Sequence, residues 1–366
     1  MRVGLNARVL SKPDPTGVAR YTRHLLSELA VLRNGREELE YSLFGVESVP
    51  DMLEGSDGIE SAGEPSPTHS GFRAHLWEQF RLPRAVNGTD IDVFHTPAGQ
   101  PPLLARVPLV TTIHDVSPIV HPEWFSRQYA ALYRVLTPLA VRASDRIVTP
   151  SEFARDEILD AYPSAAGKTV AISNGATPRQ GSGTPIDGLG PNGFLLFVGS
   201  SNPRKNVATL LQAYRRYRLS ASDPLPLALA GPDRDVFAST DRPAVEGVHA
   251  LGFVSDGELT WLYDNARAFV FPSLYEGFGL PILEAMSAGT PVVTSNRGAM
   301  AEVAGDAAHL VDPTDPDALA EGLHQILDDG EYADALCEAG QGRAGEFTWE
   351  RTARETFDVY REVANL

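Results

Sequence analysis

Glu276 and Glu284 stand with seven residues between them in a segment, residues 273–295, that is otherwise rich in glycine, proline and apolar residues. Gly277 and Gly279 allow backbone amides to approach a ligand closely, and the start of a following helix favours an anion. Ionised carboxylates accept hydrogen bonds from hydroxyl groups. Backbone amides that could bind a diphosphate, with a carboxylate on each side that could bind hydroxyl groups, indicate a sugar-nucleotide site. The alternative is that both glutamates only decorate a helix start, where acids are favoured.

The elements around this segment place it at one edge of a sheet. Ala268–Phe271 is predicted to be a buried strand, Pro272–Gly279 a turn and Pro281–Ala288 a helix. Glu276 is then on the loop, and Glu284 is in the first turn of the helix. Open α/β sheets bind ligands at the carboxyl ends of their strands, which is where this loop falls.

A basic pair, Arg204 and Lys205, follows the predicted strand Phe194–Val198 and precedes a predicted helix, Ala208–Arg218. A guanidinium fork and a compact ammonium could stabilise the charge that develops on a departing pyrophosphate. The alternative is an ordinary solvated basic pair.

His114 comes directly after the apolar strand Leu109–Ile113. A histidine at this position could be a general base, a metal ligand or a packed residue. Asp115 could orient its ring or cap the next turn. Gly17 lies in a loop that opens a predicted helix after the first strand, and by itself it indicates only a helix start.

Metal binding has little support in the spacing. His95, His114 and His121 with Asp115 match no zinc pattern. Two D-x-D pairs also occur. Asp90 and Asp92 precede a predicted strand and look like caps, whereas Asp233 and Asp235 follow a predicted strand. With Arg204 and Lys205 available for a diphosphate, we expect no essential metal and no other cofactor.

Composition restricts the class of protein. The 366 residues are 43% apolar and 22% charged, which is typical of a globular protein of two domains. A net charge of −17 argues against binding to nucleic acid. Cys337 is the only cysteine, and no apolar run reaches the roughly 18–20 residues of a membrane span. We therefore expect a cytoplasmic protein, with at most peripheral contact at the inner face of the membrane.

Short apolar runs alternate with helical stretches along the chain, which predicts the α/β class with parallel sheets. A stretch dense in Gly, Pro, Ser and Thr, residues 173–193, marks a linker. We expect two Rossmann-like domains, residues 1–180 and 181–348, facing each other across a cleft. The polar stretch 46–71 could be a mobile insertion.

The stretch from Phe271 to Asp315 resembles the retaining GT-B enzymes of glycosyltransferase family 4, the glycosyltransferase group 1 family, and the resemblance extends over nearly the whole chain. It carries the E-x7-E motif of that family. The resemblance implies that Glu284 holds the ribose hydroxyls of a donor and that Glu276 approaches the donor sugar. It also implies backbone contacts to sugar and phosphates from four successive residues, Gly277, Phe278, Gly279 and Leu280.

The same resemblance assigns the remaining candidate residues. Arg204 and Lys205 would bind the donor phosphates, although many members have an arginine where this chain has Ser200. His114 would lie near the donor sugar and the acceptor, and Gly17 would contact the phosphates or the sugar of the donor. Val254, at a strand end, would lie near the nucleotide base. The final segment, 349–366, would be a helix that packs back on the first domain.

The implied function is transfer of a hexose, with retention, from a nucleoside-diphosphate sugar to a hydroxyl of a glycan or lipid-linked acceptor in surface polysaccharide synthesis. The segments "TIHDVSP" and "PRKN" resemble a mannosyltransferase-like subgroup, which favours GDP-mannose as donor. A UDP-sugar donor, a non-catalytic sugar-nucleotide binder and a metal-dependent hydrolase are the alternatives. The segment 74–86 could touch a lipid-linked acceptor or be a packed helix of the first domain.

Overall fold

The computed structural model describes residues 1–11, 17–33, 38–66, 72–176, 183–200, 202–231 and 245–365. The chain divides into two compact units. Unit 1 comprises Met1–Ile119, Ala131–Gly175 and Thr348–Leu366, and unit 2 comprises Val120–Ala130 and Ala176–Phe347. The expected boundary after residue 180 lies outside the described residues.

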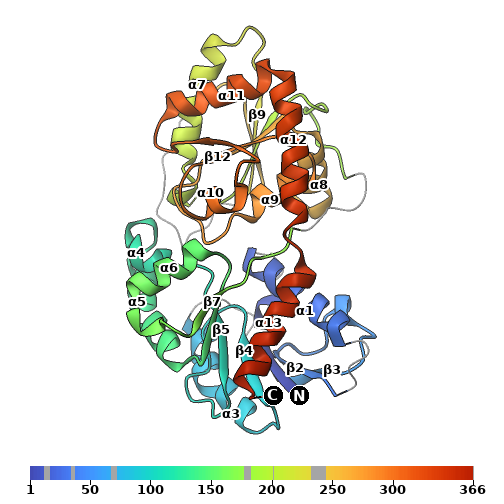
Figure 1. The fold of residues 1–366 in the computed structure, drawn as a ribbon, viewed down its shortest axis with the longest axis vertical. Helices are drawn as coiled ribbons and strands as arrows, with labels where there is room; N and C mark the ends of the chain where they lie inside the picture. The colour runs from blue at the N-terminus through green and yellow to red at the C-terminus, as the bar shows by residue number, and fades with distance from the viewer. Residues whose placement is uncertain are drawn as a thin grey trace. The chain divides into compact units, whose positions relative to one another are not determined.

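Unit 1 is built on a parallel sheet of seven strands in the order β3-β2-β1-β4-β5-β6-β7 (Figure 1). Its strands are β1 Arg2–Asn6, β2 Glu40–Gly45, β3 Ile59–Pro65, β4 Val93–Thr96, β5 Leu109–Thr112, β6 Arg146–Thr149 and β7 Thr169–Ala171. Four central strands, β1, β4, β5 and β6, are almost wholly buried. Burial on both faces explains why they read as continuous apolar runs.

The helices of unit 1 connect these strands and cover the sheet. The α-helices are α1 Gly17–Arg33, α2 Phe72–Leu76, α3 Leu82–Asn87, α6 Glu152–Ala161 and α13 Trp349–Val363. Short single-turn helices lie at Arg8–Ser11, Asp51–Leu53 and Pro163–Ala165, and a π-helical turn spans Trp77–Arg81. The last helix, α13, packs against α1 (Figure 1).

Three elements lie in or next to the short segment Val120–Ala130, which groups with unit 2. They are α4 Ser117–Val120, the short 3₁₀ helix η4 Pro122–Trp124 and α5 Arg127–Ala143. Residues Val120–Ala130 group with unit 2 although their neighbours on both sides belong to unit 1. Nothing in the sequence pattern indicates this excursion.

Unit 2 contains a second parallel sheet, of six strands in the order β10-β9-β8-β11-β12-β13. Its strands are β8 Leu195–Val198, β9 Leu227–Ala230, β10 Val248–Gly252, β11 Ala268–Phe271, β12 Val292–Ser295 and β13 His309–Val311. Its helices are η6 Pro203–Lys205, α7 Val207–Ser220, α8 Asp256–Asn265, α9 Leu280–Ser287, α10 Gly298–Ala304, α11 Pro316–Asp328 and α12 Gly330–Gly345. One apolar core joins this sheet to its helices.

The sequence left open that the polar segment 46–71 is a mobile insertion, but this segment contains β3, a strand of the first sheet. β3 pairs in parallel with β2, from Tyr41 opposite Ile59 to Gly45 opposite Pro65. Polar residues occur here because β3 is the edge strand, and only one of its sides needs a partner. Among the described residues, no helix is long and apolar enough to cross a membrane.

Candidate active site

The loop that holds the first glutamate connects β11 to α9. Gly279 precedes the helix with a φ of 110°, a left-handed conformation that a side chain would strain. The helix begins at Leu280, so Glu284 is its fifth residue. The prediction that Glu284 lies in the first turn is therefore wrong, because a turn takes 3.6 residues and Glu284 falls in the second.

Glu276 lies between the two cations of the basic pair. Its Oε1 is 2.6 Å from Nζ of Lys205, and its Oε2 is 3.6 Å from a guanidinium nitrogen of Arg204. The side chains of Glu276 and Lys205 are only 9% and 11% exposed. The Lys205 contact is an ion pair without hydrogen-bond geometry, so Oε1 has no hydrogen-bond partner among the described residues. This oxygen can still accept a hydroxyl donor.

Lys205 is held against the sheet as well as against the carboxylate. Its ammonium lies 4.6 Å from the ring centroid of Phe271, the last residue of β11. An aromatic face attracts a cation, and more strongly where water is excluded. Two cations face one carboxylate at this largely buried site. That charge balance suits an anionic ligand.

Hydrogen bonds tie the basic loop to the glutamate loop. The side chain of Asn202 accepts from the amide of Arg204 at 3.0 Å and caps η6. The carbonyl of Arg204 then accepts from the amide of Leu274 at 2.7 Å. The two loops therefore keep a fixed register, and Arg204 and Lys205 stay beside Glu276.

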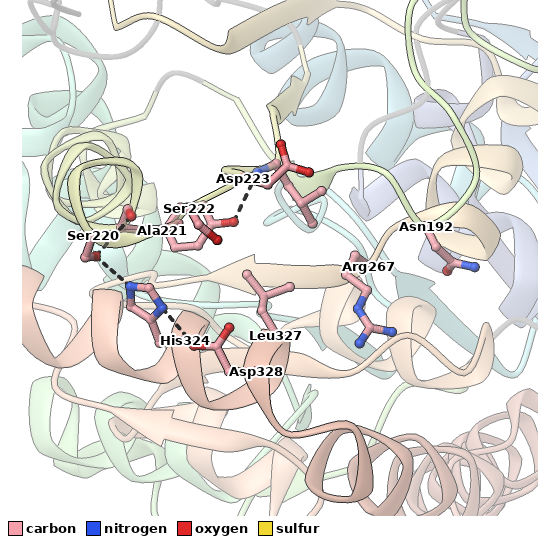
Figure 2. A pocket seen from close by; sticks show the side chains of 11 residues that line it. Asn192, Ser220, Ala221, Ser222, Asp223, Arg267, His324, Leu327 and Asp328 are labelled. Carbon is pink, nitrogen blue, oxygen red and sulfur yellow. Dashed lines mark hydrogen bonds and ion pairs between the residues drawn. The ribbon is translucent and has the colours of Figure 1, made fainter.

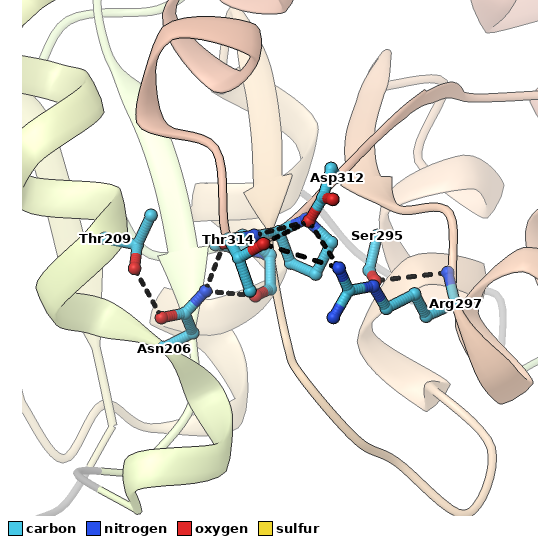
Figure 3. A network of polar contacts seen from close by, with 8 residues as sticks. Asn206, Thr209, Ser295, Arg297, Asp312 and Thr314 are labelled. Atoms are coloured by element: carbon cyan, nitrogen blue, oxygen red, sulfur yellow. Dashed lines mark hydrogen bonds and ion pairs between the residues drawn. The ribbon is translucent and has the colours of Figure 1, made fainter.

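Asn206 stabilises the same region through its side-chain hydrogen bonds (Figure 3). It adopts the left-handed conformation with φ 58°. Its side-chain amide donates to the carbonyls of Pro272 at 3.1 Å and Pro313 at 2.6 Å, and its side-chain oxygen accepts from Thr209 at 2.7 Å. One asparagine thus joins the segments that follow three strands, β8, β11 and β13.

A neighbouring polar cluster joins the ends of β12 and β13 (Figure 3). Asp312 accepts hydrogen bonds from the amide and hydroxyl of Thr314 and pairs with Arg297 at 2.7 Å. The Thr314 hydrogen bonds, followed by Arg297, lower the pKa of Asp312. The cluster keeps Asp312 ionised and orders the edge of the sheet that the candidate site shares.

Glu284 is oriented by a separate contact. The hydroxyl of Tyr263, on α8, donates to Oε2 of Glu284 at 2.9 Å, and both residues are buried. The tyrosine occupies one oxygen and sets the direction of the carboxylate.

The other predicted donor contacts are distributed around this edge. Phe278 is buried, and its ring meets that of Phe347 edge-on at 5.8 Å, so it can offer only its backbone to a ligand. Leu280 is the first residue of α9, where an amide points away from the helix. Val254 lies in the loop after β10 and is half-buried against the core.

His114 belongs to unit 1 and is half-buried at the end of β5. Its Nε2 lies 3.0 Å from the carbonyl of Pro97, and its ring meets that of Tyr21 edge-on at 4.8 Å. Because a carbonyl can only accept, Nε2 bears a proton. Burial lowers the pKa of His114, partly opposed by Pro97 and by the Asp115 carboxylate. The neutral ring then presents Nδ1 as an acceptor.

Asp115 caps the turn that follows His114. Its Oδ1 accepts from the amide of Ser117 at 2.9 Å and from the hydroxyl of Ser117. Of the two roles considered for Asp115, the structure shows the cap. Its charge still raises the pKa of His114, as a smaller effect than burial.

His95 is part of a buried hydrogen-bond chain beneath His114. Its Nδ1 is 2.6 Å from the hydroxyl of Tyr360, and its Nε2 is 2.9 Å from that of Thr112, which in turn lies 3.2 Å from the hydroxyl of Tyr21. Burial, with a smaller effect of His114, lowers the pKa of His95 to about 3. His95 is therefore a neutral structural residue, and its two nitrogens are occupied.

Comparisons with known proteins decide the family. Residues 189–343 match the family model described as "Glycosyl transferases group 1", and residues 15–180 match the one described as "Glycosyltransferase Family 4". The O-antigen chain mannosyltransferase B of Escherichia coli is 33% identical over 371 residues, which cover 94% of this chain and 96% of that protein. The chain belongs to the group 1 glycosyltransferases.

Solved structures agree on the fold of this glycosyltransferase. WaaG, a glycosyltransferase involved in lipopolysaccharide biosynthesis, superposes with a TM-score of 0.71 at 16% identity, covering 98% of this chain and 99% of WaaG. Anabaena Alr3699/HepE in complex with UDP-glucose gives 0.69 at 19% identity, covering 98% and 100%. The predicted α/β class and GT-B fold are confirmed, and the chain is a glycosyltransferase enzyme.

In this glycosyltransferase, the structure brings Arg204, Lys205 and Glu276 together in unit 2, with Glu284 on the helix that follows. His114 belongs to unit 1, as does Gly17, the exposed first residue of α1. The roles assigned to these residues in donor binding and transfer stay predictions.

A cavity of about 420 Å³ lies elsewhere in unit 2 of the glycosyltransferase (Figure 2). Its lining includes Asn192, Leu225 and Arg267, which precede β8, β9 and β11, so it lies at the amino ends of the strands. In it His324 contacts Ser220 at 2.7 Å and Asp328 at 3.1 Å. The candidate site is at the opposite, carboxyl ends, so this cavity is not part of it.

The histidines do not assemble into a metal site in the part of the chain that the structure describes, where no group of three potential ligands is found. His121 lies 3.1 Å from Glu123 and stacks on Trp124. Both ring nitrogens of His95 already have hydrogen-bond partners. Asp233 and Asp235 lie outside the described residues.

Sequence reasoning missed Asn206, Tyr263 and Tyr21 as residues that position the site. Asn206 stands in the quoted "PRKN" segment, and an asparagine before a helix is a known signal for a cap or left-handed residue. Tyr263 gave no signal of its own, since a tyrosine within an apolar helix is usually a core residue.

Proposed function

We propose that this glycosyltransferase moves mannose, with retention of configuration, from GDP-mannose to a hydroxyl of a glycan or lipid-linked acceptor in the assembly of a surface polysaccharide. The observation that carries the proposal is the buried arrangement of Lys205 and Arg204 around Glu276. Choice of mannose is supported by the relative from E. coli, which is named as an O-antigen chain mannosyltransferase and matches nearly the whole chain.

The chemistry follows from the charges. The bond between the sugar C1 and the β-phosphate oxygen breaks, and a bond from C1 to the acceptor oxygen forms on the same face. The acceptor proton passes to the departing phosphate. Negative charge grows on that phosphate, and Lys205 and Arg204 stabilise it because they are held in place before the reaction. Glu284 would bind the ribose diol.

Glu276 has two successive roles in this proposal. Without donor it is the counter-charge of Lys205 at 2.6 Å. When a diphosphate takes that place beside the cations, the carboxylate is released to accept a hydroxyl of the donor sugar. Donor binding would then exchange one ion pair for another, which avoids leaving a buried ammonium unpaired.

His114 would face the sugar or the acceptor. In the neutral ring, Nε2 donates a hydrogen bond to the carbonyl of Pro97, and Nδ1 can accept a hydrogen bond from a hydroxyl. Gly17 and the backbone of Gly277–Leu280 would contact phosphates and sugar, and Val254 the base. We further propose that the enzyme needs no essential divalent ion, because Lys205 and Arg204 already supply positive charge to the diphosphate.

A UDP-sugar is the second candidate donor. The structural neighbour HepE was solved in complex with UDP-glucose, and the match covers 98% of this chain. The residues that would contact sugar and phosphates do not distinguish between the two donors, because phosphate and ribose are common to both. We propose that the enzyme works in the cytoplasm or at the inner face of the membrane, where a lipid-linked acceptor would be reached.

The first experiment is a thermal-shift panel with GDP, UDP, ADP, CDP and dTDP, without metal and then with magnesium. A ligand at one hundred times its Kd should stabilise the wild type by about 2.7 kcal/mol. Lys205→Ala and Glu284→Ala should lose this shift, whereas Glu331→Ala, an exposed residue of α12, should keep it. Stabilisation by UDP alone would replace GDP-mannose with a UDP-sugar, and no stabilisation by any nucleotide would refute the donor site.

Turnover completes the test. The wild type with GDP-mannose and a polysaccharide or lipid-linked acceptor should release GDP, and the product should carry an α-linked mannose by NMR, the configuration of the donor. A β-linked product would contradict retention. Loss of turnover in EDTA, restored by magnesium, would contradict the metal-independent mechanism. A protein that binds nucleotide without any turnover would be a non-catalytic binder.

A further inference from the structure

The outer side of the helical segment 72–87 in unit 1 has an unexpected composition. Ala74, Trp77, Glu78, Leu82 and Val86 point inward and are buried. The outward positions of a helix on a globular protein are normally polar. Here two of them are Leu76 and Phe80, which are 40% and 54% exposed.

The π-helical turn Trp77–Arg81 helps produce this arrangement. It widens the helix by a residue, so that Trp77 and Glu78 are both inside while Leu76 and Phe80 lie four positions apart on the outside. Glu78 is the only carboxylate between residues 72 and 87, and it is fully buried against Arg8 at 2.8 Å and His75 at 3.2 Å. No acidic residue of this segment therefore reaches its outer surface.

The following loop extends the same surface. The side chain of Gln79 donates to the carbonyl of Pro101 at 3.0 Å and accepts from the amide of Leu103 at 3.3 Å. Asn87 donates to the carbonyl of Leu104 at 3.1 Å and accepts from the amide of Arg106 at 2.8 Å. These bonds hold Leu104, which is 67% exposed, beside the end of α3.

Four exposed arginines accompany the three apolar side chains. They are Arg73, Arg81, Arg84 and Arg106. Arg84 donates to the carbonyl of Phe80, and none of the four pairs with a carboxylate within the described residues. Acidic residues outnumber basic ones by 48 to 31 in this chain, so a group of arginines without carboxylate partners is against the general trend.

We propose that this apolar–arginine face, made of Leu76, Phe80, Leu104 and the four arginines, docks unit 1 on an anionic lipid bilayer. The apolar side chains would enter the interfacial region and the arginines would meet lipid phosphates, the combination that membrane-surface segments use. The rest of the chain is strongly acidic and would be repelled by such a surface, so docking would occur in one orientation. A lipid-linked acceptor would then be presented at the same surface.

The choice of a bilayer over a protein partner rests on this charge arrangement. A flat anionic surface satisfies several arginines at once without needing matched carboxylates. Membrane docking does not depend on donor binding in unit 2, so either proposal can fail without the other.

The test is co-sedimentation of the full-length protein with vesicles of phosphatidylcholine alone and with 30% phosphatidylglycerol. The wild type should bind the anionic vesicles and not the neutral ones, and binding should weaken as salt is raised. Each arginine near an anionic surface contributes about five-fold to the partition coefficient, the equivalent of about 1 kcal/mol. The double variant Arg81→Gln/Arg84→Gln should therefore bind roughly 30-fold more weakly.

The apolar part is tested with Phe80→Ser and Leu104→Ser, each expected to lower binding about ten-fold or more. Leu219→Ser is the matched control, since Leu219 is an 89% exposed apolar residue of unit 2. All variants should keep the thermal shift with the nucleotide, which shows that they are folded. Equal binding to neutral vesicles, unchanged binding in the arginine variant, or no binding by the wild type would each overturn the proposal, and the last would favour a protein partner.

Discussion

Replacing Glu276 with glutamine should separate its two roles, because it removes the charge and preserves the shape. Breaking a buried ion pair by removing one partner costs about 3–5 kcal/mol. The three side chains of this cluster are 9–19% exposed, so some water reaches them. We expect Glu276→Gln to lower the free energy of unfolding of unit 2 by about 2–3 kcal/mol. Lys205→Met in the same chain should restore at least half of it.

The same variant should bind a nucleoside diphosphate more tightly than the wild type. In the wild type the diphosphate must compete with the Glu276 carboxylate for Lys205, and the two anions repel each other. Both penalties disappear in Glu276→Gln, and we expect about ten-fold tighter binding, equivalent to about 1.4 kcal/mol. Sugar transfer should fall by about a hundred-fold or more, because a carboxylate contact to the reacting sugar is lost.

The measurements are urea unfolding, calorimetric titration with the nucleotide chosen by the thermal-shift panel, and donor turnover. Glu331→Gln, which changes an exposed carboxylate of α12, controls for the change in net charge. Weaker nucleotide binding together with unchanged stability would refute the counter-charge role of Glu276. Unchanged turnover would refute its contact with the sugar.

Three other substitutions test the surroundings of the site. His95 has a pKa of about 3 in the folded chain against about 6.5 in the unfolded chain, so the unfolded state binds more protons between these pH values. The contribution of His95 to the free energy of unfolding is therefore complete above pH 6.5 and falls by about 2 kcal/mol on going to pH 5. His95→Gln should remove that part of the pH dependence of urea unfolding. Tyr263→Phe deletes the 2.9 Å bond to Glu284 and should raise the KM for donor about three- to ten-fold with little change in kcat, whereas an unchanged KM would argue against a ribose role for Glu284. Gly279→Ala, at φ 110°, should cost about 1–2 kcal/mol of stability, while Gly342→Ala, in an open helical position, should be neutral or stabilising.

Local sequence pattern was sufficient for most elements of both sheets. β11 begins and ends at the residues that were predicted, Ala268–Phe271. Such strands are bounded by turn residues and buried on both faces, so the apolar run and the strand coincide. Helix ends were less certain: α9 starts one residue early because Gly279 takes the left-handed conformation, and that moved Glu284 into the second turn.

Contacts between distant parts of the chain could not be predicted. His95 and Tyr360 are 265 residues apart, and nothing near either one indicates the hydrogen bond that joins them. The grouping of Val120–Ala130 with unit 2 also depends on contacts between residues far apart in the sequence. His121 and Trp124 stack there on each other and lie against Tyr275, which is more than 150 positions away. Single-sequence patterns report periodicity and turns, and they contain no information on which surfaces meet.

The candidate site shows how a motif can identify residues and leave their physical roles incomplete. The E-x7-E motif pointed to Glu276, and the family resemblance pointed to Lys205 and Arg204, each with a contact to donor. A lysine as buried as Lys205 needs a counter-charge whenever donor is absent, and Glu276 at 2.6 Å supplies it. Loss of activity in a Glu276 variant could therefore reflect a collapsed cation site or a missing sugar contact. Tighter nucleotide binding with slower transfer can arise only if the cations stay in place, and that combination isolates the contact with the sugar.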